Sequence, residues 1–202
     1  TNPNHPVIIY PEGLVNLSFQ GRRSIKKGMK EEEPYIIEDK NILTTKEKEY
    51  IENIILGEKL PFYWVKETIH GKGEPCLVHG LIHRKTQQIV SSHADFFKKI
   101  TKRFADRHKI PCNIFLRGCI NLTFPHPERS TPHIDHPFPH YQFLLHLNKS
   151  NGGATLILDS KKKVIKTIRP QQFKGFGFKG GPPHCMIFPK SGRRVIAVLT
   201  FC

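Results

Sequence analysis

The second half of the chain is a succession of short β-rich runs, and this pattern constrains the fold more than any other feature. From Cys112 onward the runs are NIFLRGCINLTF, HYQFLLHLN, ATLIL, KVIKTI, GFGF, HCMIF and RVIAVLTF. Turn signals separate them, notably Asn151-Gly152-Gly153, Gly180-Gly181-Pro182-Pro183 and Ser191-Gly192. Many short strands at close spacing predict an antiparallel sandwich or barrel.

Two helices are predicted ahead of this β-rich part. Residues 44–56 begin with Thr44 and Glu47 at the spacing of a capping box and continue with an apolar stripe that includes Tyr50 and Ile51. A second helix, from about Ser92 to His108, carries an apolar stripe made of Phe96, Phe97, Ile100 and Phe104. Its remaining basic residues form either a phosphate-binding strip or a solvated face.

The region between the helices contains one predicted strand, from Leu60 to Ile69, whose aromatic residues Phe62, Tyr63 and Trp64 are expected in the core. Residues 1–40 are rich in proline and charge and are expected to form an N-terminal arm. A length of 202 residues suits a single domain, here residues 41–202, which can bury a core without disulfides.

Composition narrows the class of protein. No apolar run approaches the roughly 20 residues that span a bilayer. Five scattered cysteines without a CxxC pair indicate reduced thiols, as in a cytoplasmic protein, rather than a zinc knuckle. The net charge of +15 either attracts nucleic acid or another anionic partner, or reflects solvated lysine-rich faces.

His133-Ile134-Asp135 is the first part of a candidate metal site. Alternate residues of a strand point to the same face, so His133 and Asp135 would present an imidazole and a carboxylate to a common point. The alternative interpretation is a satisfied polar pair at the end of a strand. His184, directly after the Gly180–Pro183 turn, would complete a set of two histidines and one carboxylate. Such a set leaves adjacent positions open on iron(II), whereas a four-ligand zinc site is closed.

Arg194 lies on the next predicted antiparallel strand, beyond the turn at Ser191-Gly192. A guanidinium group matches a carboxylate in bidentate geometry, so Arg194 is suited to hold the distal carboxylate of 2-oxoglutarate. Arg193 should point to the opposite face, and a register shift of one residue would exchange the two roles.

The HxD motif, the GGxT-like turn Gly152-Gly153-Ala154-Thr155, the late His184 and the Ser-Gly-x-Arg motif ending at Arg194 form an ordered set. Together they resemble the superfamily of iron(II)- and 2-oxoglutarate-dependent oxygenases. The likeness covers about residues 112–202 and is weaker over residues 44–110. The chain is most similar to the prolyl-4-hydroxylase-like branch, and it is also similar to small phage-encoded members.

This resemblance implies a mainly β fold with flanking helices (α+β), built as a double-stranded β-helix, a distorted, cupin-like jelly roll. It implies His133, Asp135 and His184 as catalytic metal ligands, and 2-oxoglutarate bound by Arg194, Asn121 and Thr123. Thr123 stands where nucleic-acid demethylase relatives place a tyrosine, and His146 where prolyl-hydroxylase-like chains have an aromatic residue before asparagine.

The implied activity is that of a dioxygenase that hydroxylates an unactivated C–H bond and releases succinate and CO2. Its cofactors would be iron(II), 2-oxoglutarate and O2, with ascorbate as a candidate reductant. The branch favours a peptide or protein substrate with hydroxylation at a residue such as proline. Asp135 disfavours halogenation, because halogenating relatives replace this carboxylate with a small residue. Two alternatives remain: a nucleic-acid base oxygenase, and a non-enzymatic metal-binding β-barrel with the same ligands.

Other polar residues have roles that the sequence leaves open. Arg117 either faces a phosphate or carboxylate of a substrate or forms a structural salt bridge. His136 and His140 are expected to be exposed loop histidines rather than substrate contacts. Cys185 should alternate away from the metal into the core. The remaining candidates, for the entrance of the site, are His126 and Arg129.

Overall fold

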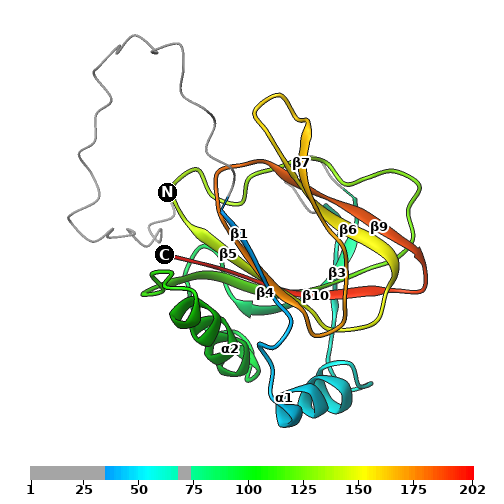
Figure 1. Ribbon diagram of the computed structural model, residues 1–202. Helices are drawn as coiled ribbons and strands as arrows, with labels where there is room; N and C mark the ends of the chain where they lie inside the picture. The colour runs from blue at the N-terminus through cyan, green and yellow to red at the C-terminus, as the bar shows by residue number, and fades with distance from the viewer. Residues whose placement is uncertain (1–34, 68–73) are drawn as a thin grey trace, which may run out of the picture. The chain divides into compact units, whose positions relative to one another are not determined.

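The computed structural model describes residues 35–67 and 74–202, which form two antiparallel sheets and two helical segments (Figure 1). Across the larger sheet, the strands in order are β1 (Ile36–Asp39), β8 (Gly175–Lys179), β5 (Tyr141–His146), β10 (Arg194–Phe201), β4 (Phe115–Thr123), β3 (Cys76–Ile82) and β2 (Tyr63–Val65). Across the smaller sheet they are β7 (Val164–Ile168), β6 (Asn151–Leu158) and β9 (His184–Ser191). The mainly β prediction is confirmed, and the finer double-stranded β-helix stays a prediction.

Strand β10 lies in the middle of the larger sheet and has a core on each of its faces. Val195 and its alternate neighbours pack with the helices, whereas Ile196 and Val198 pack with Ile157 of the smaller sheet. Alternation along a strand produces this division, and burial on both faces explains the nearly continuous apolar run RVIAVLTF. The space between the two sheets is therefore reached by side chains from both.

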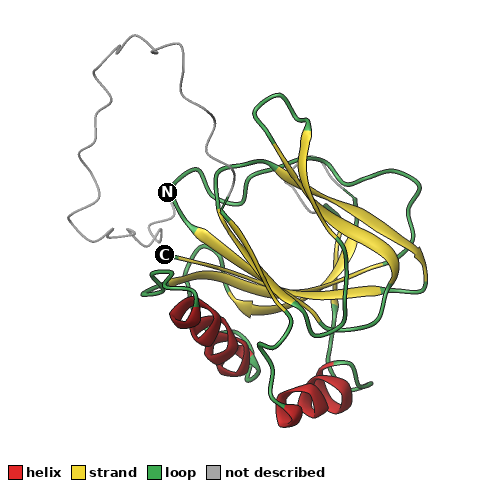
Figure 2. Ribbon diagram, viewed as in Figure 1, coloured by secondary structure: helices red, strands yellow, loops and turns green. Residues whose placement is uncertain are grey.

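Both predicted helices are present and lie on one side of the larger sheet, opposite the smaller sheet (Figure 2). The first is α1 (Thr45–Tyr50), which continues into a π-helical segment, η1 (Ile51–Ile55). The second is α2 (Ala94–Arg107), which buries Phe97, Ile100 and Phe104, as its periodicity predicts. These helices close the back of the sheet that carries the site.

The predicted strand over Leu60–Ile69 is shorter than expected, and the prediction that its aromatic residues are buried is wrong for two of them. Only Tyr63–Val65 form β2, and residues 68 and 69 lie outside the described residues. Tyr63 and Trp64 are 66% and 67% exposed, because β2 is the edge strand of the sheet and nothing described covers it. Phe62 packs partly against the core.

Two strands were not predicted. β3 pairs with β4, but His79 and Gly80 interrupt its apolar pattern, which hides it in the sequence. β1 pairs with β8 and comes from the last residues of the segment assigned to the N-terminal arm. The rest of that predicted arm, residues 1–34, lies outside the described residues.

Glu47 belongs to the cap at the start of α1 and also joins this helix to α2. In the predicted capping box, Thr44 N donates to Glu47 Oε2 at 2.9 Å and Glu47 N donates to Thr44 Oγ1 at 3.3 Å. Arg103 adds a bidentate pair, with Nη1 and Nη2 at 2.8 and 2.7 Å from the two carboxylate oxygens. The hydrogen bonds from Arg103, opposed by burial and helped by Thr44, lower the pKa of Glu47 to about 2.

Replacing Glu47 with Gln is expected to lower the free energy of unfolding by about 2 kcal/mol at pH 7. The folded-state pKa lies below the unfolded value of 4.5, so this stabilisation is complete above about pH 4.5 and is lost as the pH falls toward 2. Urea denaturation of wild type and variant across this range measures the difference. Glu49→Gln, at an exposed position of the same helix, is the control, and a difference that does not change with pH would contradict the prediction.

Candidate metal centre

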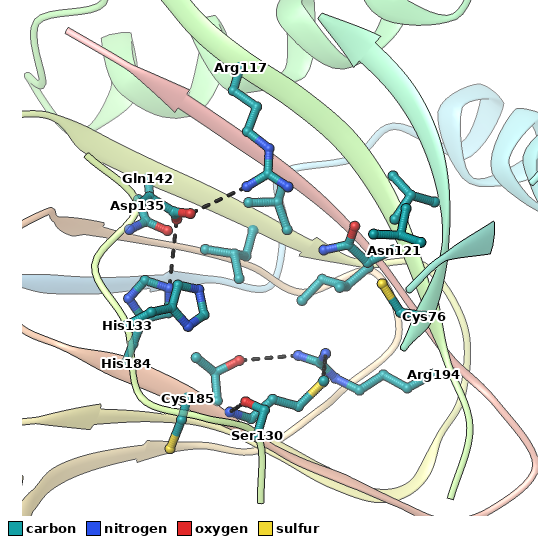
Figure 3. Close-up of a pocket in the computed structure, with 17 residues that line it drawn as sticks. Cys76, Arg117, Asn121, Ser130, His133, Asp135, Gln142, His184, Cys185 and Arg194 are labelled. Carbon is teal, nitrogen blue, oxygen red and sulfur yellow. Dashed lines mark hydrogen bonds and ion pairs between the residues drawn. The ribbon is translucent and has the colours of Figure 1, made fainter. Parts of the chain in front are cut away.

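A cavity of about 210 Å³ lies between the two sheets and contains most of the residues that the sequence singled out (Figure 3). Strands β4, β5 and β10 supply one wall and β6 and β9 the other, while Ser130, His133 and Asp135 come from the connection between β4 and β5. Apolar side chains, including Leu144, Ile196 and Val198, fill much of the first wall. Nine of the seventeen lining residues are nevertheless polar or charged, so the cavity offers both ligand groups and an apolar surface.

His133, Asp135 and His184 meet at one end of this cavity. One ligand atom from each residue lies within 4.8 Å of those of the other two, and the Nε2 of His184 is 3.6 Å from Asp135 Oδ2. Backbone hydrogen bonds hold the two histidines together: His133 N donates to His184 O at 3.0 Å, and His184 N donates to His133 O at 2.9 Å. The HxD segment is thus attached to the start of β9, which sets the geometry of the group.

The protonation states of these residues suit a metal. Burial would raise the pKa of Asp135, but the nearby histidines and arginines, His184 first, lower it to about 2. Burial lowers the pKa of His184 to about 4. The Nδ1 of His133 is 3.1 Å from Thr131 O, and because a carbonyl only accepts, Nδ1 donates this hydrogen bond and Nε2 is the nitrogen left to bind a metal. At neutral pH the group therefore offers an ionised carboxylate from Asp135 and a neutral imidazole from His184, with the second imidazole supplied by His133.

Two arginines hold the carboxylate of Asp135. Arg84 donates from Nη1 to the backbone oxygen at 2.7 Å and from Nη2 to Oδ1 at 3.1 Å, and Arg117 Nη1 donates to Oδ1 at 3.3 Å. Oδ2 remains directed toward His184. Of the two roles left open for Arg117, the salt bridge is present. The role of Arg84 was missed, because it lies in the segment around β3, which carries no motif.

Arg194 lies at the opposite end of the cavity, and its guanidinium group is buried without a carboxylate partner among the described residues. Its Nη2 donates to Thr155 Oγ1 at 3.1 Å, its Nη1 is 2.9 Å from Met186 Sδ, and its Nε has no partner. Burial lowers the pKa of Arg194 to about 10. Arg193 is exposed, as the predicted register requires. Thr155 is the threonine of the GGxT-like turn, so the structure brings these two predicted motifs together.

Asn121 and Thr123 both lie near Arg194 but differ in access to the cavity. Asn121 lines it, and its Oδ1 accepts a hydrogen bond from Cys119 Sγ at 3.3 Å. Thr123 is buried opposite Arg194 on β4, where its Oγ1 is 3.5 Å from the Arg194 backbone oxygen. Thr123 is absent from the cavity lining, and its role in binding 2-oxoglutarate stays a prediction.

The prediction that His136 and His140 are exposed is wrong. They are 8% and 1% exposed, because the loop after Asp135 folds over the end of the sheet. His136 Nε2 lies 2.8 Å from Thr200 Oγ1, and His140 Nδ1 donates to Phe138 O at 2.8 Å. Both rings therefore anchor the loop that carries Asp135.

Several residues outside the metal group have simpler environments. Cys185 is buried, as predicted, while His126 is exposed and packs against Phe188. His146 is buried, and its Nε2 has no hydrogen-bond partner. Burial, and then the charge of Arg194, lower the pKa of His146 well below its usual value.

Gly180 allows the loop before His184 to lie against the buried ring of His140, and a Cβ atom on Gly180 would collide with that imidazole. We expect Gly180→Ala to lower the free energy of unfolding by about 2 kcal/mol and to weaken metal binding. Thermal denaturation and metal titration measure the two effects. Gly80→Ala is the control, since its Cβ would meet only Val90 Cγ2 at 3.4 Å. A Gly180→Ala variant as stable as wild type would contradict this packing argument.

Comparisons with solved structures identify the fold. No family model and no curated protein sequence matches the chain. Solved structures do match, among them an oxidoreductase of the 2OG-Fe(II) oxygenase family from Burkholderia pseudomallei, with a TM-score of 0.67 and 15% identity over 85% of this chain and 86% of that one. The chain therefore has the fold of the 2-oxoglutarate- and iron(II)-dependent oxygenases.

Two further structural neighbours are prolyl hydroxylases. A prolyl-4-hydroxylase from Pseudomonas putida has a TM-score of 0.54 and 10% identity over 82% of this chain and 91% of that one. A prolyl hydroxylase from Trichoplax adhaerens, solved with a peptide fragment of hypoxia inducible factor, has a TM-score of 0.57 and 12% identity over 82% of both chains. Likeness at these identities establishes the fold, and the side chains of the cavity must carry the argument about chemistry.

Proposed function

We propose that the protein is an iron(II)- and 2-oxoglutarate-dependent dioxygenase that hydroxylates an unactivated C–H bond. One observation carries this proposal: the His133, Asp135 and His184 group shares a small cavity with Arg194, a buried cation that has no carboxylate partner among the described residues. An isolated buried charge is unfavourable, so a guanidinium group in this position calls for an anionic ligand. A non-enzymatic metal-binding barrel would not explain why the guanidinium group of Arg194 is buried in this cavity.

The donor set fits iron(II). Two imidazoles and one carboxylate leave coordination positions for a chelating 2-oxo acid and for dioxygen. His133 and His184 would each give a ring nitrogen, and Asp135 would bind through Oδ2, because Arg84 and Arg117 occupy Oδ1. Monodentate binding of this carboxylate keeps the remaining positions free.

The opposite end of the cavity fits the distal carboxylate of 2-oxoglutarate. Arg194 would pair with it, the Thr155 hydroxyl would hold the guanidinium group in place, and Asn121 would line the same space. When bound, iron(II), 2-oxoglutarate and O2 supply the oxidising chemistry, with succinate and CO2 as products. Leu144, Ile196 and Val198 limit the access of water to this space.

The substrate that we propose is a peptide or protein, hydroxylated at a residue such as proline. Support comes from the sequence resemblance to the prolyl-4-hydroxylase-like branch and from neighbours with that activity in their names. The basic face of α2, which suggested nucleic acid, is largely paired within the protein: Arg103 with Glu47, Arg107 with Asp39, Lys98 with Asp95 and Lys102 with Asp106. Among the described residues, no helix has the length and apolarity needed to cross a bilayer.

Anaerobic addition of iron(II) and then 2-oxoglutarate to the purified protein tests the cofactor assignment. Chelation of iron(II) by a 2-oxo acid gives a weak visible charge-transfer band, and we expect this band in the wild-type protein. If metal binds but the band never forms, the protein is a metal-binding barrel instead.

A panel of proline-containing peptides tests the substrate class, with succinate formation as the measurement. We expect at least one peptide to raise succinate above the rate without substrate. If the whole panel leaves that rate unchanged, the peptidyl-proline assignment is wrong, although the cofactor assignment would stand on its own band.

A further inference from the structure

The single negative charge of Asp135 is paired with two positively charged guanidinium groups, those of Arg84 and Arg117. Arg84 and Arg117 both donate to Oδ1, and neither arginine has another carboxylate within ion-pair distance in the described parts of the chain. The thiol of Cys119, beside Arg117, supplies no negative charge, because burial raises its pKa. Two guanidinium groups that repel one another thus converge on a single oxygen.

Cofactor binding does not remove this imbalance. Arg117 and Arg194 line the cavity and Arg84 reaches Asp135 from beside it, whereas Asp135 supplies the one carboxylate among the described residues that line the cavity. An iron dication and a 2-oxoglutarate dianion add charges that cancel, and the dianion uses Arg194. The loaded site therefore keeps an excess of positive charge beside the metal group, where the local dielectric is low and charges act strongly.

The two arginines also retain unused hydrogen-bond donors. A guanidinium group has five N–H donors, of which the contacts to Asp135 use two from Arg84 and one from Arg117. The guanidinium group of Arg117 points into the cavity (Figure 3). The side chain of Arg84 is 44% exposed, so it can be reached from solvent. One arginine therefore lines the cavity, and the other is accessible from solvent while contacting the same carboxylate.

Further cations lie at the same end of the sheets. Ile157 of β6 pairs with His184, and two residues later Asp159 begins a turn that displays Lys161, Lys162 and Lys163. The Asp159 carboxylate accepts hydrogen bonds from the backbone N–H groups of Lys161 and Lys163, at 2.9 and 2.8 Å, which fixes the turn. Lys179 lines a surface groove with Ile134, the middle residue of the HxD motif. These lysines attract anions toward the end of the sheets where His184 lies.

We propose that Arg117 and Arg84 bind an anionic group of the primary substrate, a carboxylate or a phosphate monoester, beside the metal group. The inference rests on the proposed function and narrows its substrate class to molecules that carry an anion near the reacting carbon. A purely structural role would need only one arginine to orient Asp135. An anionic ligand would pair with the second guanidinium group. It would also accept hydrogen bonds from those N–H groups of Arg84 and Arg117 that do not contact Asp135.

Titration calorimetry with acetate and sulfate tests the proposal, since acetate represents a carboxylate and sulfate a phosphate monoester. The protein is loaded with zinc(II) and saturating 2-oxoglutarate, so that Arg194 is occupied, and ionic strength is held constant. We expect at least one anion to bind wild type, with a Kd raised about 10-fold in Arg84→Gln and nearly unchanged in Arg84→Lys. Lys99→Gln, at an exposed position of α2, is the control and should bind as wild type does.

Which of the two anions binds identifies the anionic group that the substrate carries. Binding of sulfate alone indicates a phosphate-bearing substrate, and binding of acetate alone indicates a carboxylate. The proposal is overturned if neither anion binds wild type, or if Arg84→Gln binds both as tightly as wild type. Failure here with a normal 2-oxoglutarate band would leave the proposed function intact. If that band is absent, the same titration with zinc(II) alone still reports on Arg84.

Discussion

Arg194→Met is expected to raise the Kd for 2-oxoglutarate by about 100-fold or more, the largest effect that we predict for co-substrate binding. Arg194 is buried and has no carboxylate partner in the described structure, so its ion pair with the distal carboxylate would form in a low-dielectric environment. Methionine keeps the length and packing of the side chain but removes every donor. Titration of the charge-transfer band under anaerobic conditions measures this Kd.

The same substitution should not destabilise the protein without its ligands. Removing a buried cation that lacks a counterion relieves a desolvation penalty, so the melting temperature of unloaded Arg194→Met should equal or exceed that of wild type. Arg193→Met, at the exposed neighbouring position, is the matched control and should bind 2-oxoglutarate normally. If Arg193→Met were the impaired variant instead, the strand register at the site would be wrong.

His133→Ala is expected to weaken iron(II) binding by about 1,000-fold and to abolish the charge-transfer band. The reason is that His133 supplies one of the three ligand groups found among the described residues, and the Nδ1 hydrogen bond to Thr131 O already orients its ring. Metal titration monitored by calorimetry gives the affinity. Since metal bound to the folded state stabilises it, added iron(II) should also raise the melting temperature of wild type but not of this variant.

His126→Ala provides the control for this experiment. His126 lies in the same connection between β4 and β5 but is exposed and packs against Phe188, away from the metal group. It should bind iron(II) as wild type does. Unchanged metal affinity in His133→Ala would show that the His133, Asp135 and His184 group is a polar cluster and not a metal site.

Local sequence patterns predicted the elements whose causes are local. The capping box at Thr44 and Glu47 starts α1, and the apolar periodicity of α2 gives its buried face. The HxD motif was predicted to lie in a strand, but His133 and Asp135 lie in the connection between β4 and β5, where His133 forms an isolated bridge with His184. The two helix features follow from the geometry of one helix, which a short stretch of sequence is enough to specify, whereas the position of His133 depends on its bridge to the distant His184.

Burial of isolated polar and aromatic residues could not be predicted in the same way. Trp64 is a large aromatic residue of the kind expected in a core, but it lies on an edge strand and is exposed. His140 lies in a loop and was expected to be exposed, but its ring is buried against Gly180. In both cases the environment is set by which distant segment covers the residue. That information depends on strand order and loop path, which no local pattern contains.

The sequence by itself determined the chemistry available to this protein: a histidine, a carboxylate, a second histidine and an arginine in an order typical of one superfamily. Only the tertiary structure decided how that chemistry is held. It brings Arg84 from beside β3 to the carboxylate of Asp135 and buries Arg194 with no carboxylate partner in the described parts of the chain. Ligand types follow from residue identity, whereas charge balance depends on which side chains meet across two sheets, and that is settled only when the chain has folded.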